Sequence, residues 1–301
     1  MDTEQYCKYI SSRGLLKSCD IYSLTPISGI SNMINYNLNF QGKINIHHPT
    51  IYVCISSLKY FIKYISNTIL YEYILVTGDN DETCPYDLLT EEEFKQFISN
   101  KNLIHWFSQN CALINNEKLS QIPIGLDYHT MSFRDHAWGK KTTPMNQENI
   151  LINIKNKSLP FYERINKIYS NFHFFMETKF GYDRKDALHK ISKDLLYCEP
   201  YKVERDKSWE NQSKYTFVAS PHGNGLDCHR TWEALCLGCI PIVKTSILDE
   251  LYVDLPVLIV KEWSNVSQKL LDETIVKFKN MTFNYEKLTL NYWKNKINSY
   301  K

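Results

Sequence analysis

The chain has 301 residues, of which 43% are hydrophobic and 23% are charged, a composition typical of a globular rather than a disordered protein. Its 35 basic and 33 acidic side chains give a formal net charge of +2, and this balance argues against a dedicated nucleic-acid-binding protein. The length corresponds to one large domain or two domains of ordinary size.

Neither targeting segments nor metal motifs are evident. Residues 1–5 lack the basic and apolar pattern of a secretory signal, and no apolar run approaches the roughly 20 residues of a membrane span. The cysteines number nine; Cys236 and Cys239 stand three apart, but no second ligand pair follows at zinc spacing. We therefore expect no membrane span, no metal and a reducing compartment.

Buried strands alternate with helices along the first half of the chain. Strands are expected at 51–55, 73–77, 103–107 and 119–124, and helices at 58–65 and 90–98. Thr90 and Glu93 form a capping-box pattern at the start of the second helix. Such alternation is typical of a parallel α/β sheet.

A polar stretch over 134–149 predicts a hinge, after which the alternation resumes. Strands are expected at 150–154, 215–219, 240–243 and 257–260, and helices at 159–170, 183–193, 226–237, 266–278 and 285–297. The sequence thus predicts two α/β domains, residues 1–145 and 146–301, with a cleft between them.

The most informative segment is 217–243, which reads as a strand, a glycine loop, a helix, a tight turn and a strand. Gly223 and Gly225 lie where the strand turns into the helix, where glycine permits positive φ values and lets backbone N–H groups approach an anion. The positive end of the helix dipole, near Leu226, favours the same ligand.

A helical wheel divides this helix into two faces. The core face carries Cys228, Trp232, Leu235 and Cys239, and the opposite face carries His229, Arg230 and Glu233. Arg230 is close enough to the glycine loop to bind a diphosphate, and Glu233 is placed to accept hydrogen bonds from ribose hydroxyls. The plainer interpretation is a solvated i, i+3 Arg–Glu pair.

The order Ser-Pro-x-Gly-Asn-Gly-x-Asp-x-x-Arg-x-Trp-Glu-Ala-Leu from Ser220 onward resembles the nucleotide-sugar segment of exostosin-like glycosyltransferases (family 47), especially the ribitol xylosyltransferase branch and its relatives in algae and large DNA viruses. The stretch 122–127 is similar to the turn that closes many N-terminal domains of GT-B enzymes. The resemblance implies a GT-B fold of two Rossmann-like domains, with the donor in the C-terminal one. It also implies that Arg230 binds the diphosphate and Glu233 the ribose.

The expected donor site therefore comprises Ser220, His222, Gly223, Asn224, Gly225, Asp227, His229, Arg230, Glu233 and Lys244. His222 and Lys244 are candidates for donation to the leaving phosphate.

Four residues at strand ends of the first half are candidates for the catalytic base: Asp79, Asp81, Asp127 and His129. Asp79 is the first choice, because it follows Gly78 at the end of an apolar strand, where partial desolvation raises a carboxyl pKa. Asp79 and Asp81 also form a DxD triplet, which in GT-A glycosyltransferases holds a divalent cation. A simple turn after the strand explains the same residues.

The expected function is an inverting, metal-independent transfer of a sugar, with xylose as one candidate, from a UDP-sugar to a glycan hydroxyl. The partners are then the nucleotide sugar and the glycan acceptor, with no resident cofactor and no nucleic acid. The composition and the absent anchor indicate a viral or microbial protein that acts in the cytoplasm. A viral protein would act in the host cytoplasm or lie in the virion. The alternatives are a metal-dependent GT-A enzyme using Asp79 and Asp81, and a non-catalytic nucleotide- or glycan-binding protein.

Overall fold

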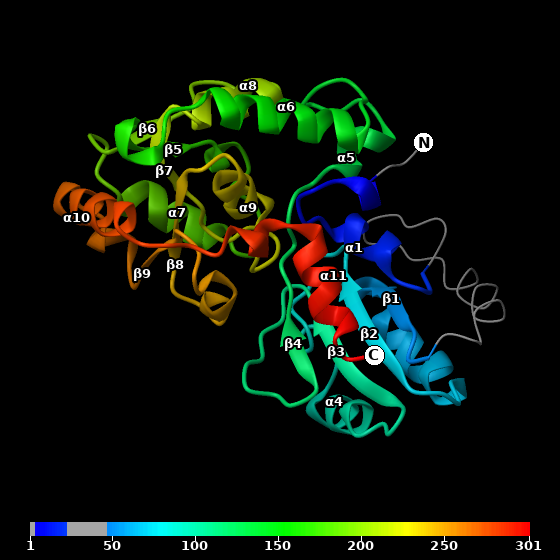
Figure 1. Ribbon diagram of the computed structural model, residues 1–301. Coiled ribbons are helices and arrows are strands. Elements are labelled where there is room, and N and C mark those ends of the chain that lie inside the picture. Colours follow the sequence, from blue (N-terminus) through cyan, green and yellow to red (C-terminus); the bar gives the residue numbers. More distant parts are fainter. Residues whose placement is uncertain (1–3, 23–46) are drawn as a thin grey trace.

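Two parallel sheets form the framework of the protein, as the computed structural model shows for residues 4–22 and 47–301 (Figure 1). The first sheet has four strands in chain order: β1 (Thr50–Cys54), β2 (Tyr73–Gly78), β3 (Leu103–Ser108) and β4 (Leu119–Gln121). All pairings in it are parallel. Its strands are almost wholly buried, because helices and loops cover both faces, as parallel sheets require.

The second sheet has five parallel strands in the order β6-β5-β7-β8-β9. Their bounds are β5 (Ile165–Ser170), β6 (Leu196–Cys198), β7 (Tyr215–Ala219), β8 (Ile240–Lys244) and β9 (Leu258–Val260). The chain leaves β5 toward one edge to form β6 and then returns to the other side to form β7. A doubly wound sheet of this kind has a crevice at its carboxyl edge where the direction reverses. The predicted α/β class with two parallel sheets is confirmed.

Helices connect the strands and cover the sheets. The helices are α1 (Ser12–Ser18), α3 (Leu58–Tyr60), α4 (Glu91–Ile98), α5 (His129–Phe133), α6 (Pro144–Lys157), α7 (Gly181–Lys190), α8 (Arg205–Gln212), α9 (His229–Cys236), α10 (Gln268–Lys279) and α11 (Leu290–Asn298), and a π-helical segment, Phe61–Ile65, follows α3. The predicted capping box of α4 is confirmed: Thr90 Oγ1 accepts from the Glu93 N–H, and Glu93 Oε2 from the Thr90 N–H. Within the described ranges, no helix has the length and apolar character needed to cross a membrane.

Two predicted elements between the sheets are wrong. The expected strand at 150–154 lies inside α6, which begins with a Thr143 cap and Pro144 in its first turn, a strong start for a helix. The expected helix at 159–170 is instead a short turn followed by β5, because Ile165, Ile168 and Tyr169 pair with β7. The strand β6 and the helix α8 were not predicted.

The last helix returns to the first half of the molecule. The Leu290 N–H donates to the Lys8 carbonyl at 2.8 Å, and the Tyr300 ring lies 4.2 Å from that of His105 in β3. Figure 1 shows α11 beside α1 and the first sheet. The domain boundary at 145/146 stays a prediction, and the segment that ends the chain lies against the first half.

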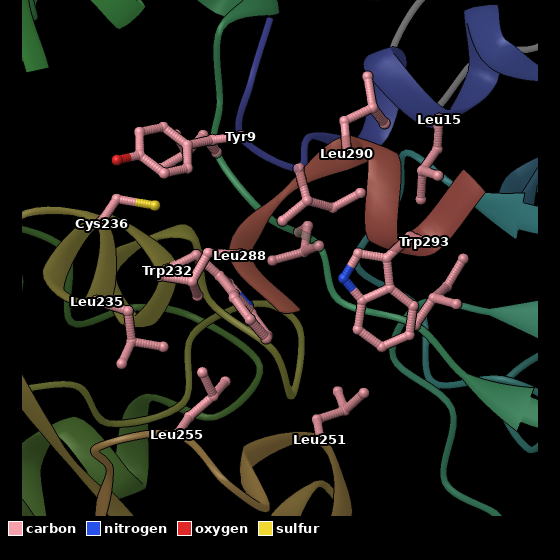
Figure 2. Packing of buried hydrophobic residues seen from close by; sticks show 14 of the residues in the cluster. Tyr9, Leu15, Trp232, Leu235, Cys236, Leu251, Leu255, Leu288, Leu290 and Trp293 are labelled. Carbon is pink, nitrogen blue, oxygen red and sulfur yellow. The ribbon is translucent and has the colours of Figure 1, made fainter. Parts of the chain in front are cut away.

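One hydrophobic cluster joins the two halves. It contains residues from α1, α9 and α11 and from the turn around Leu251, with further clusters inside each half. Figure 2 shows Trp293 of α11 and Trp232 of α9 on opposite sides of Leu288. Trp293 is 1% exposed, and its Nε1 donates to the Lys287 carbonyl at 2.8 Å. Packing of α11 therefore contributes to the arrangement of both sheets.

We expect Trp293→Ala to lower the free energy of unfolding by about 3–5 kcal/mol, because it leaves a cavity in the shared cluster and removes a buried hydrogen bond. Urea denaturation measures this loss. The control Asn295→Ala, at an exposed position of the same helix, is expected to change the value by no more than about 0.5 kcal/mol. Equal effects of the two substitutions would contradict the role assigned to α11.

Candidate functional site

A cavity of about 360 Å³ lies at the carboxyl ends of strands from both sheets. The first half contributes Asp81, after β2, and Asp127, after β4. The second half contributes Asn171, Glu199 and the glycine loop 223–225, which follow β5, β6 and β7. The cavity thus includes the crevice where the second sheet reverses direction, which is the usual place for a ligand in such sheets.

The glycine loop is shaped by close approach and not by unusual dihedral angles. A Cβ atom on Gly223 would lie 2.5 Å from the Arg184 guanidinium, and one on Gly225 would lie 2.9 Å from the Asn110 carboxamide. Neither glycine adopts the positive φ that glycine permits, whereas Gly125 and Gly238 do. Glycine is needed at 223 and 225 because polar side chains pack directly on the backbone.

The helix after this loop begins at His229, three residues later than predicted, with Cys228 at its N-cap. Asp227 therefore lies in the loop, where its carboxylate accepts the N–H groups of Ile124 (2.8 Å), Cys228 (2.9 Å) and the Trp232 indole (2.8 and 2.9 Å). Burial raises the pKa of Asp227 to about 6 although these donors favour its ionised form. Because Ile124 belongs to the first half, Asp227 ties the two halves together.

The predicted faces of α9 agree with the structure except at Cys228, which was assigned to the core face but is the half-buried N-cap residue and lines the cavity. Trp232 and Leu235 are buried, while His229, Arg230 and Glu233 line the cavity. The Arg230 guanidinium donates through Nε to Asn171 Oδ1 at 3.2 Å and lies over the Phe172 ring at 5.6 Å.

Burial lowers the pKa of Arg230 to about 10, which leaves it protonated at neutral pH. Among the described residues, Arg230 makes no ion pair with Glu233, so the plainer Arg–Glu interpretation does not describe this helix.

Sequence reasoning missed a second arginine in the cavity, Arg184 of α7. Its side chain is 7% exposed and donates to the backbone carbonyls of Phe175 and His222. Gly223 packs against its guanidinium. No pattern around 184 marks it as functional, because α7 reads as an ordinary polar helix. Only the position of α7 beside the glycine loop brings Arg184 to the cavity.

Asp79 lies behind the cavity wall. Its side chain is 1% exposed, Arg13 Nε lies 3.4 Å from its Oδ2, and the backbone φ is +60°. Its backbone N–H donates to Gln109 Oε1 at 2.9 Å. Asp81, two residues later, is exposed and does line the cavity. The DxD triplet therefore directs one of its two carboxylates toward the cavity and the other into the first half.

Asp127 and His129 form a buried network with Arg205 of α8. His129 Nδ1 lies 3.3 Å and Arg205 Nη2 3.5 Å from the Asp127 carboxylate, and Arg205 Nη1 also donates to the Asp127 carbonyl. Burial alone would raise the pKa of Asp127, but the charges of His129 and Arg205 hold it well below its usual range. Burial lowers the pKa of His129, so at neutral pH Arg205 is the permanent cation in this network.

Three of the predicted donor-site residues do not line the cavity. Ser220 Oγ is hydrogen-bonded to Thr231 Oγ1 at 2.8 Å, and His222 Nδ1 lies 2.6 Å from the Leu226 carbonyl, so both hold the loop in shape. Lys244 Nζ lies 3.1 Å from Glu262 Oε2, and its side chain is not part of the cavity lining. His129 is also absent from the lining.

The remaining walls are largely aromatic. The rings of Trp138, Phe172, Phe174, Phe175 and Trp209 line the cavity. Two of them, Trp138 and Trp209, contact the Arg205 guanidinium, with the charge 4.5 and 5.7 Å from the ring centroids. A cavity lined by both guanidinium groups and aromatic rings suits a ligand with both anionic and ring-shaped parts.

No protein-family model and no curated protein matches the chain. In residues 4–22 and 47–301, no group of three His, Cys, Asp or Glu side chains is placed to hold a metal ion.

We expect Arg205→Ala to lower the free energy of unfolding by about 3–5 kcal/mol at neutral pH, because it leaves the buried Asp127 carboxylate without its cation. The folded-state pKa of Asp127 is depressed, so this contribution is present above the ordinary aspartate pKa of about 4 and is lost as the pH falls. Urea denaturation at neutral and at acidic pH measures both effects.

Lys207→Ala is the matched control, since Lys207 lies on the same helix in an exposed pair with Glu210. Its expected loss is no more than about 1 kcal/mol. A loss for Arg205→Ala that does not shrink at acidic pH would show that Asp127 is not its partner in stability.

Proposed function

We propose that the protein transfers a sugar from a nucleotide sugar, a UDP-sugar in the first place, to the hydroxyl of a glycan acceptor, with its two sheets in a GT-B arrangement. One observation carries the proposal: Arg184 and Arg230 line the same cavity, and across the described ranges neither forms an ion pair with an acidic side chain. Their fixed partners are neutral carbonyl and amide oxygens. Two guanidinium groups so placed favour a ligand with two adjacent negative charges, such as a diphosphate.

The rest of the cavity supports a nucleotide sugar over a bare diphosphate. Glu233 lies one turn further along α9 than Arg230, where its carboxylate is available to ribose hydroxyls, as the family resemblance implies. The aromatic side chains of the cavity lining suit stacking on a base or a sugar ring. The cavity has walls from both halves, which gives donor and acceptor one wall each.

The geometry suggests how the chain promotes such a transfer. The acceptor oxygen attacks the anomeric carbon while the bond to the diphosphate breaks, and negative charge grows on the departing phosphate oxygen. Arg184 and Arg230 are already oriented by hydrogen bonds before any ligand enters, so they stabilise that charge without reorganisation. Burial strengthens this interaction because the surroundings screen charge less than water does.

The metal-dependent alternative has less support. Of the two DxD carboxylates that would hold a cation, only Asp81 reaches the cavity, because the Asp79 side chain is 1% exposed and faces Arg13. The arginines offer the countercharge that a cation would otherwise provide. Turnover of a UDP-sugar, even slow hydrolysis without an acceptor, separates an enzyme from a non-catalytic binding protein.

We expect Arg184→Gln and Arg230→Gln each to weaken UDP binding by about 2 kcal/mol, or roughly 30-fold, because each removes a charged hydrogen-bond donor to the diphosphate. Isothermal titration calorimetry with UDP and with uridine measures the effect. Uridine affinity is expected to stay unchanged, since uridine has no phosphate. For Arg230→Gln, the loss of transition-state stabilisation calculated from the fall in kcat/KM is expected to reach roughly 2–4 kcal/mol.

Lys185→Gln is the control, because Lys185 follows Arg184 on α7 but is exposed and lies near Glu177. UDP affinity unchanged in both arginine variants would contradict the proposed site. Equal loss of uridine and UDP binding would instead indicate a distorted cavity.

Activity is expected to survive EDTA, because the cations of the site belong to the chain itself. The measurement is UDP release from a UDP-sugar before and after chelation. Loss of turnover on chelation, restored by Mn²⁺, would overturn the metal-independent mechanism and favour the DxD triplet as a cation site.

A further inference from the structure

The imidazole of His229 is held in a single tautomer. Its Nδ1 lies 2.7 Å from the carbonyl oxygen of Gly125, and a carbonyl oxygen only accepts hydrogen bonds. Nδ1 therefore carries the proton, and in the neutral ring Nε2 has the free lone pair. Gly125 has a φ of +67°, and a Cβ at this position would collide with the Ile10 carbonyl. The Gly125 carbonyl oxygen that accepts this hydrogen bond is therefore held in place by the packing of Gly125 against Ile10.

The ring of His229 lines the cavity, and Nε2 has no hydrogen-bond partner in the part of the chain that the structure describes. Of the carboxylates among the predicted bases, Asp81 also lines the cavity but is exposed to solvent, and the other two are differently placed. Asp79 lies behind the wall beside Arg13, and both oxygens of Asp127 already accept hydrogen bonds from Thr130. An available lone pair at the cavity is what a general base requires.

His229 and Arg230 are consecutive, yet they extend toward opposite walls. His229 contacts Gly125 in the first half, whereas Arg230 contacts Asn171 after β5 in the second half. A diphosphate on Arg230 and Arg184 directs its sugar toward the space between these walls. An inverting displacement needs the base on the face of the sugar opposite the leaving diphosphate, a requirement that a base on the wall nearer Gly125 would meet.

We propose that His229 is the general base of the transfer, an inference that rests on the proposed function. Nε2 takes the proton of the acceptor hydroxyl as its oxygen forms a bond to the anomeric carbon. The bond from that carbon to the diphosphate oxygen breaks, and its electron pair leaves with the diphosphate. The proton remains on the imidazole, which is then a cation, and passes to solvent after product release.

The charged and titratable groups around His229 come from both halves. Asp127, His129 and Asp227 interact with it electrostatically, and the His129 ring is 6.5 Å away. The Asp127 carboxylate favours the imidazolium that forms during transfer. His129, kept neutral by burial, adds little repulsion against this positive charge on His229. Carboxylates of both halves therefore lie close enough to His229 to interact with a charge on its ring.

Two substitutions test the proposal. His229→Asn keeps an N–H group at the position of Nδ1 toward Gly125, and His229→Gln places a neutral amide near the position of Nε2. Neither has a base. Both are expected to lower kcat for UDP-sugar turnover by about 10²–10⁴-fold. The dissociation constant for UDP is expected to stay within about threefold of wild type, which also shows that the variants fold.

The assay is UDP release from UDP-xylose, UDP-glucose, UDP-galactose and UDP-N-acetylglucosamine, with His189→Asn, at an exposed position of α7, as the control that keeps full activity. A kcat within about threefold of wild type in either variant would overturn the assignment of His229 as the base and leave the proposed transfer standing. So would a fall in UDP affinity as large as the fall in kcat, which would make His229 a donor-holding residue. A wild-type protein that turns over none of these sugars would overturn the proposed transfer itself.

Discussion

The carboxylate of Asp227 is the interaction on which the site depends. It accepts a backbone N–H of the first half, from Ile124, and the indole N–H of Trp232 in the second half. Its own backbone N–H donates to Asn110, again in the first half. Because Asp227 lies two residues before α9, these bonds fix the start of that helix against the first sheet. The contact between His229 and Gly125 follows from this placement.

The two halves bring different chemistry to the cavity. The second half supplies the guanidinium groups of Arg184 and Arg230, and the first half supplies the carboxylates of Asp81 and Asp127. The second half also adds the carboxylates of Glu199, Asp227 and Glu233, so charges of both signs line one space with aromatic walls, where water screens them less. Arg205 crosses between the halves to neutralise Asp127, so the carboxylate side is stable without a ligand. The cationic side has no such internal partner among the described residues, and it is there that we place the anionic ligand.

The sequence predicted strands best where apolar runs end at polar turns. Residues 73–77 and 215–219 became β2 and β7 almost as expected, and the capping box at Thr90 fixed the start of α4. The errors fell at 150–154 and 159–170, where short apolar runs suit a helix or a strand equally well. At 159–170, pairing of β5 with β7 decided in favour of a strand. No local sequence signal indicates a strand partner that lies about fifty residues away.

The amino-acid sequence by itself determined which face of α9 carries Arg230 and Glu233, because a helical period assigns faces without knowledge of the fold. It also marked the loop 223–225 as a place where other groups approach the backbone closely. Only the tertiary structure brought Arg184 to that loop, buried Asp79 behind Arg13 and turned His229 toward the first half. The physical reason is that a cavity at the carboxyl ends of two sheets collects side chains from strands and helices far apart in the chain. Their meeting depends on strand order and helix packing, which no local pattern encodes.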